Sequence, residues 1–400
     1  MVSRRAAHGA PRGGIPPHLR LVTAPGLAGA AAEEVSALLP GVPAREADSS
    51  TVHVELPGYD AARLAAAARA VLALRAAGRV VLDLVRDVPA EPGPLSAVVR
   101  ELPWEDWLPP DARFAVRATG RSPALRHTVH VARLVKDAVR DRFRGRGGAA
   151  PPVDPRRPRV LLDVAIRRGA CSIGLDLGGG SLHARAGRRD AAAPLREDVA
   201  AGLAHLAGAR GAAPLLDPFC GSGTLLAEAA AVALGLPAAR DPRGLALGAL
   251  LPFRDAPLGE IAEELASRRP PGDHAPILGA DADPARVAEA RALLARAGLA
   301  GHVEVREAPV EELELADEVV ATPGLVLTNP PWGRRLEGPG VRAAWRALGT
   351  LARRLPGWTL AVLSGDPALT RELGLAASRR HPVLVGGVDA RLLLYPLRPR

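Results

Sequence analysis

Several residue types are almost absent from this 400-residue sequence. It holds no glutamine, one lysine, one asparagine and two cysteines, Cys171 and Cys220, which lie far apart. The cysteines form no C-x-x-C pair and no His/Cys cluster at zinc spacing, which argues against a zinc site. We therefore expect no bound metal and two reduced thiols in a cytoplasmic protein.

Long apolar runs are also lacking. The Ala/Leu-rich stretches are interrupted by Arg, Asp or Pro well short of the roughly 20 apolar residues that a membrane-spanning helix needs, so we do not expect a membrane protein. The basic start of the chain has no apolar stretch after its arginines. We expect residues 1–19 to form a flexible leader and not a signal peptide.

The net charge is +9 and the sequence pI is about 10.9. A basic protein can bind nucleic acid by releasing counterions from phosphates. However, the whole chain is skewed towards Ala, Arg, Gly and Pro, and this skew raises the pI without any ligand. The placement of the cations is therefore more informative than their number.

Residues 122–147 carry the most strongly patterned basic segment. Apolar residues recur at helical spacing on one side, and cations recur at intervals of three and four on the other. These cations, the basic stripe, are Arg133, Lys136, Arg140 and Arg144. A solvated helix face would show the same pattern. We favour RNA binding because the nearby acids, Asp137 and Asp141, are expected to point away from the stripe.

The order of predicted elements divides the chain in two. Residues 20–190 read as short strands and amphipathic helices of an α+β region. Residues 191–400 show regular strand and helix alternation, which predicts an α/β domain with a doubly wound parallel sheet. A Pro- and Gly-rich insertion lies between about 236 and 274.

In such sheets ligands bind at the carboxyl ends of the strands. After the first strand of this domain stands DPFCGSGT, residues 217–224, whose glycines allow close backbone approach before a helix that offers free N–H groups. It is neither a dinucleotide nor a triphosphate fingerprint. The carboxylate of a methionine moiety is a reasonable ligand for this helix end.

Acidic residues follow the next two strands. Asp283 precedes Pro284 and is expected to cap a helix. This leaves Asp281 without a structural role and free to bind a ribose diol. Glu307, after the third strand, could accept a hydrogen bond from an adenine amino group or be an ordinary exposed glutamate.

The fourth strand leads into NPPW, which contains Asn329, the chain's one asparagine. The Asn329 side-chain oxygen and the Pro330 carbonyl could together hold the N–H groups of a purine amine, so that its lone pair points at an electrophilic methyl group. The second proline, Pro331, helps to fix that carbonyl. Trp332 offers a face on which an unpaired base can stack.

These motifs resemble class I S-adenosylmethionine-dependent methyltransferases of the N-P-P-aromatic type that methylate amines. Residues 131–143, 160–189 and 193–203 also resemble the THUMP RNA-binding domain and its junction with the catalytic domain, preceded by a ferredoxin-like region. The combination is similar to the bacterial large-subunit (23S) ribosomal RNA guanine-N2 methyltransferases, often labelled adenine-specific DNA methylases. The resemblance implies cofactor binding by Asp217, Phe219, Gly221, Ser222, Gly223 and Asp281, and base binding by Asn329, Pro330 and Trp332.

The sequence departs from the family pattern at Ala186 and Gly187, where glycine and tyrosine are usual, and at Arg334, where glutamate is usual. Three alternatives remain: a transfer RNA guanine-N2 methyltransferase, a DNA adenine-N6 methyltransferase, and a non-catalytic RNA-binding protein. The basic stripe argues against the second, and the intact Asn329 and Asp281 argue against the third. Pyrimidine C5 methylation would need a nucleophilic cysteine, and Cys220 is better explained as a packing residue.

Overall fold

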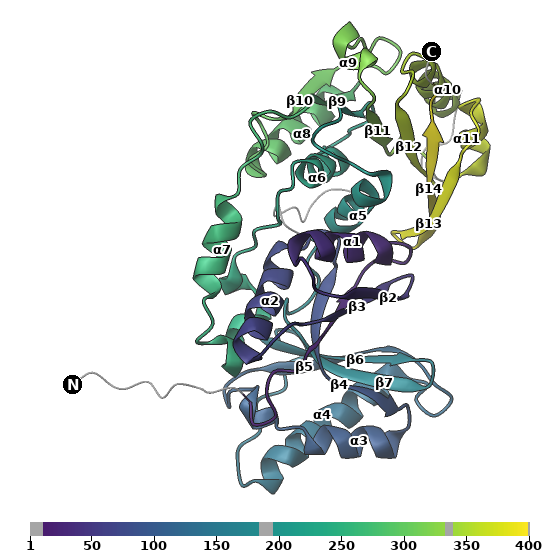
Figure 1. The fold of residues 1–400 in the computed structure, drawn as a ribbon. Helices are drawn as coiled ribbons and strands as arrows, with labels where there is room; N and C mark the ends of the chain where they lie inside the picture. The colour runs from purple at the N-terminus through teal and green to yellow at the C-terminus, as the bar shows by residue number, and fades with distance from the viewer. Residues whose placement is uncertain (1–10, 184–194, 333–338, 399–400) are drawn as a thin grey trace.

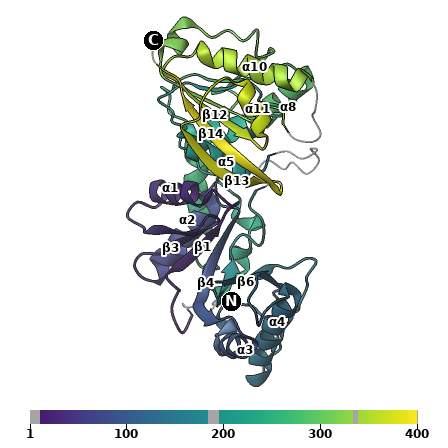
Figure 2. The ribbon, with the colours of Figure 1, turned by 90° about the vertical axis from the view of Figure 1, so that its right-hand side faces the viewer.

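The computed structural model of the chain describes residues 11–183, 195–332 and 339–398. The molecule is elongated, with one β-sheet towards each end (Figures 1 and 2). The N-terminal region forms the lower sheet of Figure 1, and the C-terminal region forms the upper one. None of the helices in the described residues is long and apolar enough to cross a lipid bilayer.

Seven strands form the first sheet, in the order β2-β3-β1-β4-β7-β6-β5. Neighbouring strands are antiparallel except for the parallel pair β5 and β6. Because β4 pairs with both β1 and β7, one continuous sheet joins the first elements of the chain to those after residue 113. The strands are β1 His18–Val22, β2 Ala44–Asp48, β3 Thr51–Glu55, β4 Arg79–Pro89, β5 Phe114–Gly120, β6 Val160–Arg167 and β7 Ala170–Asp176.

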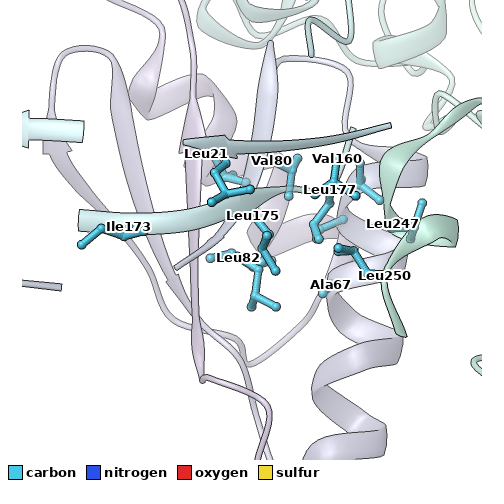
Figure 3. Close-up of a cluster of buried hydrophobic side chains, with 14 of the residues drawn as sticks. Leu21, Ala67, Val80, Leu82, Val160, Ile173, Leu175, Leu177, Leu247 and Leu250 are labelled. Atoms are coloured by element: carbon cyan, nitrogen blue, oxygen red, sulfur yellow. The ribbon is translucent and has the colours of Figure 1, made fainter. Parts of the chain in front are cut away.

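Alternating apolar residues of these strands face the helices and form the core of the first region. The helices are α1 Ala28–Leu38, α2 Asp60–Ala73, α3 Pro92–Glu101, the 3-10 turn η1 Trp104–Asp106 and α4 Thr128–Gly145. Figure 3 shows Leu21, Leu82 and Leu175 of three adjacent strands in this core. Leu247 and Leu250, from the Pro- and Gly-rich insertion, pack into the same cluster.

That insertion therefore links the two regions. It consists of η2 Pro242–Gly244, η3 Ala246–Ala249, η4 Leu251–Phe253 and α7 Leu258–Ser267. Its chain begins and ends in the second sheet's region but buries its apolar residues against the first. On the opposite side of the junction, the Leu384 amide donates to the Pro25 carbonyl at 3.0 Å.

The second sheet has the order β10-β9-β8-β11-β12-β14-β13. The first five strands are parallel, and β14 runs antiparallel to both of its neighbours. The strands are β8 Leu215–Asp217, β9 Ile277–Asp281, β10 Glu304–Glu307, β11 Leu325–Thr328, β12 Thr359–Ser364, β13 Arg379–Val385 and β14 Val388–Pro396. The helices are α5 Glu197–Ala207, α6 Thr224–Ala233, α8 Pro284–Arg296, α9 Asp317–Ala321, α10 Pro339–Arg353 and α11 Pro367–Glu372.

Some expectations need adjustment. Strand β1 begins at His18 and Ile15 is 1% exposed, so the folded part of the chain starts before the expected leader limit at residue 19. The Ile15 amide donates to the Asp60 carboxylate at 2.7 Å, which ties this segment to α2. The departures from the family pattern at Ala186, Gly187 and Arg334 lie outside the described residues.

Candidate active site

The second sheet changes direction between β8 and β11. From β8 the chain continues through β9 and β10 on one side, and it returns to place β11 and β12 on the other. The carboxyl ends of β8 and β11 therefore lie together, at the position where open α/β sheets bind ligands. This edge brings DPFCGSGT next to NPPW, as the sequence predicted.

A buried hydrogen bond joins the two motifs. The Thr328 hydroxyl, at the end of β11, donates to Asp217 Oδ1 at 2.6 Å, and both residues are buried. The Phe219 amide donates to the same oxygen at 3.2 Å. Asp217 Oδ2 is buried and has no hydrogen-bond partner within the described residues.

Burial raises the pKa of Asp217 to about 7, with a smaller contribution from the neighbouring Asp281, while the hydrogen bonds from Thr328 and Phe219 oppose this increase. A buried oxygen without a donor is costly for a carboxylate. An N–H or ammonium group of a ligand would satisfy Oδ2 and favour the ionised form.

The loop after β8 is shaped by glycines. Gly221 and Gly223 have φ of +53° and +85°, in the left-handed region that side chains disfavour. A Cβ at Gly223 would lie 2.9 Å from the Ala290 Cβ of α8, so this position also needs a glycine for space. The loop turns directly into α6, and the Cys220 amide donates to the Ala280 carbonyl of β9 at 2.9 Å.

Asp281 has a structural role that the sequence did not predict. Its carboxylate accepts hydrogen bonds from the Gly221 and Asp283 amides, each at 2.9 Å, and thereby ties the glycine loop to the end of β9. The expectation that it has no structural role is wrong. Each carboxylate oxygen keeps a further lone pair, so Asp281 can still accept from a ligand.

The other two acids lie where the sequence placed them. Asp283 caps α8 by accepting a hydrogen bond from the Ala285 amide at 2.8 Å, and Pro284 is the first helical residue. Glu307 is exposed at the end of β10, directly beside Asp281 in the pairing of β10 with β9. Both carboxylates thus line the same edge of the sheet.

Two indole N–H groups fix the NPPW turn. Trp332 Nε1 donates to Asn329 Oδ1 at 2.7 Å, and Trp345 Nε1 of α10 donates to the Pro331 carbonyl at 2.9 Å. An amide oxygen has two lone pairs, so Asn329 Oδ1 retains one for a substrate amine. The Pro330 carbonyl accepts no hydrogen bond from the described residues and is available as the second acceptor.

The Trp332 ring rests against the backbone after β12. A Cβ at Gly365 would lie 2.5 Å from Trp332 Cζ3 and 2.9 Å from Cε3, so a side chain at this position would displace the ring. Trp332 is half-buried and packs against both apolar clusters of the second region. Its ring is therefore held in one place beside Asn329.

Comparisons with known protein families identify the family of this chain. The family described as "RMKL-like, methyltransferase domain" matches residues 185–393, and the THUMP domain matches residues 94–176. The chain belongs to the RMKL-like methyltransferase family. The expected fold is thereby confirmed: a class I S-adenosylmethionine-dependent methyltransferase sheet that follows a THUMP-containing α+β region.

Individual relatives agree with this assignment. The "Ribosomal RNA large subunit methyltransferase K/L" of Chromohalobacter salexigens is 38% identical over 344 residues, which cover 83% of this chain and 47% of that protein. The protein of the same name from Marinobacter nauticus is 37% identical over 342 residues, which cover 83% of this chain and 47% of that protein. The chain thus spans about half the length of the curated K/L relatives that it matches.

Two solved structures share the fold over nearly all of this chain. A protein of Listeria monocytogenes, described as a predicted N6-adenine-specific DNA methylase, is 26% identical, with a TM-score of 0.80 and coverage of 95% of this chain and 96% of that one. SMU.472, described as a candidate methyltransferase complexed with SAH, is 21% identical, with a TM-score of 0.80 and coverage of 96% and 98%.

The residues of this methyltransferase fit S-adenosylmethionine. The Asp217 Oδ2 atom lacks a donor within the described residues, which suits the ammonium group of a methionine moiety. At Gly221 and Gly223, the two left-handed glycines of this loop, no side chain blocks the close approach of a ligand. Cys220, in the same loop, is 6% exposed, and burial raises the pKa of its thiol, so it is a packing residue and no nucleophile.

The basic stripe on α4 of the methyltransferase is partly neutralised. Lys136 Nζ lies 3.1 Å from Asp137, and Arg144 Nη1 lies 3.3 Å from Asp141. The expectation that these acids point away is wrong. Asp141 and Arg144 are three residues apart and so are neighbours on the helix surface, and Asp137 directly follows Lys136, whose long side chain reaches it. The other stripe residues have no ion-pair partner within the described part of the chain: Arg133 and Arg140.

Three contributors to the site were not predicted from the sequence. Thr328 adjoins Asn329 and could have been noted as a polar residue at the end of an apolar strand. Trp345 and Gly365 lie well away from the motif in sequence, and no local pattern distinguishes them. Their roles depend on the packing of α10 and of the segment after β12 against the NPPW turn.

Proposed function

We propose that this protein is an RNA methyltransferase that transfers a methyl group from S-adenosylmethionine to the exocyclic N2 amine of a guanine in large-subunit (23S) ribosomal RNA, in the cytoplasm. The observation that carries the proposal is the Asn329 turn. Two acceptor oxygens stand at the carboxyl end of β11, joined to the glycine loop through Thr328 and Asp217. The name of the K/L relative supports ribosomal RNA as the substrate.

The cofactor would lie along the edge formed by β8, β9 and β10. Asp217 would accept from the methionine ammonium, and the N-terminus of α6 would favour its carboxylate. Asp281 would accept from the ribose hydroxyls, and Glu307 would accept from the adenine amine. The remaining contacts would come from the loop residues Phe219, Gly221, Ser222 and Gly223.

Bound S-adenosylmethionine supplies an electrophilic methyl group. A purine amine is a poor nucleophile because its lone pair is delocalised into the ring. Asn329 Oδ1 and the Pro330 carbonyl would accept from its two N–H groups and favour the pyramidal form with an available lone pair. The ring of Trp332 would hold the base by stacking. Correct positioning for in-line attack supplies most of the rate enhancement in such a site.

The NPPW motif does not distinguish the alternative functions, which differ in the nucleic acid that is methylated. The description of the Listeria protein points to adenine-N6 methylation of DNA. The THUMP match and the ribosomal RNA relatives support RNA instead. A transfer RNA guanine would use the same acceptors. In each RNA case, Arg133, Lys136, Arg140 and Arg144 of the basic stripe would contact phosphates.

Replacement of Asn329 tests the proposal. Asn329→Ala removes one acceptor and should reduce kcat to background, while the Kd values for RNA and for S-adenosylmethionine stay near those of the wild type. Asn329→Asp keeps acceptor oxygens for both the indole and the amine, and we expect it to retain more turnover than the alanine variant. An equal loss of turnover and RNA affinity in Asn329→Ala would contradict the assigned role.

A further inference from the structure

A large cavity lies beside the proposed base site. Its volume is about 900 Å³, and it is bounded by three parts of the chain. These are the segment after β12, the β13–β14 hairpin, and a wall from the N-terminal region. The wall is formed by Pro25, Gly26 and Ser49. The cavity therefore lies at the junction between the two regions, near the carboxyl end of β12.

The cavity directly adjoins Trp332, the proposed stacking residue for the base. Gly365 lines it, and the same glycine lies against the ring of Trp332. A nucleotide whose base reached Trp332 and Asn329 would therefore have its backbone close to this opening. The backbone of the N-terminal region packs closely against β13 at this wall. A Cβ at Gly26 would lie only 1.9 Å from the Pro382 carbonyl oxygen, so only a glycine fits there.

The lining is rich in cations that have no protein partner. Arg371, Arg380 and Arg391 are exposed, and none forms a hydrogen bond or ion pair through its side chain within residues 11–183, 195–332 and 339–398. Asp366 and Asp389 also line the cavity, but the Asp366 carboxylate accepts from the Ala368 amide and caps α11. The unpaired arginines therefore exceed the acids that could neutralise them.

Sheet geometry places two of these arginines on one face. In the β13–β14 pair, Arg380 is opposite Leu393 and Pro382 is opposite Arg391. Because side chains alternate between the faces of a strand, Arg380 and Arg391 are diagonal neighbours on the same face. Arg371 reaches the same cavity from α11.

We infer that this cavity binds the phosphodiester backbone of the RNA strand next to the target base, through Arg371, Arg380 and Arg391. The inference rests on the proposed function. Guanidinium groups bind phosphate oxygens in a bidentate manner, and unpaired, exposed arginines lose no internal ion pair when they do so. Phosphate contacts fix the position of the strand without reading its sequence. The cavity thus holds the register of the nucleotide on Trp332, and the basic stripe contacts RNA farther away.

The double variant Arg380→Ala/Arg391→Ala tests this inference, with Arg379→Ala as the matched control. Arg379 is exposed on the same strand, but it pairs opposite Leu394 on the other face and does not line the cavity. The probe is an unmodified, protein-free transcript of large-subunit ribosomal RNA. Its KM and kcat, the salt dependence of its Kd, and the Kd for S-adenosylmethionine are measured for each protein.

We expect the double variant to raise the RNA KM by about tenfold or more, since hydrogen bonds to charged groups are lost. The slope of log K against log salt should become shallower by about 1.4, from two contacts of about 0.7 each with single-stranded RNA. The cofactor Kd should stay unchanged, and Arg379→Ala should match the wild type.

Three results would overturn the inference, and they are distinguishable. If the wild type methylates the transcript but the double variant shows the same KM and salt slope, the cavity does not bind the backbone and the proposed function still stands. If the wild type methylates no RNA, the proposed function fails, and this inference fails with it. An equal loss in Arg379→Ala would also contradict it, because the effect would then come from general surface charge.

Discussion

The hydrogen bond from Thr328 to Asp217 makes a specific prediction about the cofactor site. Thr328→Val preserves the shape of the side chain but removes the donor 2.6 Å from Asp217 Oδ1. A buried hydrogen bond to a charged group contributes about 1.5 to 3 kcal/mol. Because 1.36 kcal/mol corresponds to one pH unit, the variant should raise the pKa of Asp217 by roughly one to two pH units.

The assay is the affinity for S-adenosylmethionine measured by calorimetry between pH 5.5 and 9. In the wild type, burial raises the pKa of Asp217 to about 7. Binding of the ammonium group needs the carboxylate, so affinity should increase as the pH rises through about 7 and fall again where the ammonium group loses its own proton. In Thr328→Val the same increase should occur roughly one to two pH units higher, whereas Thr328→Ser keeps the hydroxyl and should follow the wild type.

Stability should respond to the same carboxyl group. The folded-state pKa of Asp217 is raised above its ordinary value of 3.8, so the folded protein holds a proton that the unfolded chain releases. Its contribution to the free energy of unfolding therefore falls as the pH rises from about 4 to 7. Thr328→Val should lose more stability at pH 8 than at pH 5. An unchanged pH profile in this variant would refute the coupling between the two motifs.

Two further predictions concern the substrate. Arg133→Glu/Arg140→Glu, in the basic stripe, should weaken RNA binding and flatten its salt dependence without changing the cofactor Kd, as filter binding at several salt concentrations would show; unchanged RNA affinity would contradict a role for the stripe. Gly365→Ala places a Cβ 2.5 Å from the Trp332 ring. It should raise the activation free energy by roughly 1.4 kcal/mol or more, which lowers kcat at least tenfold, while cofactor affinity is retained. Wild-type turnover in this variant would show that the ring position does not matter.

Local sequence patterns predicted the parallel strands of the second sheet but not its antiparallel β13–β14 hairpin. The strands β8, β9, β11 and β12 are short apolar runs that end in turn or polar residues, so their parallel arrangement could be derived from the sequence. The β13–β14 hairpin was missed. Its first strand begins with Arg379, Arg380 and His381 and contains Pro382, which is typical of an edge strand and gives little alternation.

The same distinction holds for the site. The order of Asp217, Asp281 and Asn329 along the chain, each at a strand end, sufficed to predict that they meet at one edge. The bond from Trp345 to the Pro331 carbonyl could not be predicted, because it depends on how α10 packs. The double use of Asp281 was missed for a similar reason, since its partner amide at Gly221 lies 60 residues away.

We propose that the chain methylates a guanine amine in ribosomal RNA. The most direct measurement is methyl transfer from labelled S-adenosylmethionine to separate pools of unmodified large-subunit ribosomal RNA, transfer RNA and DNA, with the product nucleoside identified by mass spectrometry. We expect N2-methylguanosine in the ribosomal RNA. The same nucleoside in transfer RNA alone would contradict the substrate, and N6-methyladenine in DNA, or no label despite tight RNA binding, would contradict the activity.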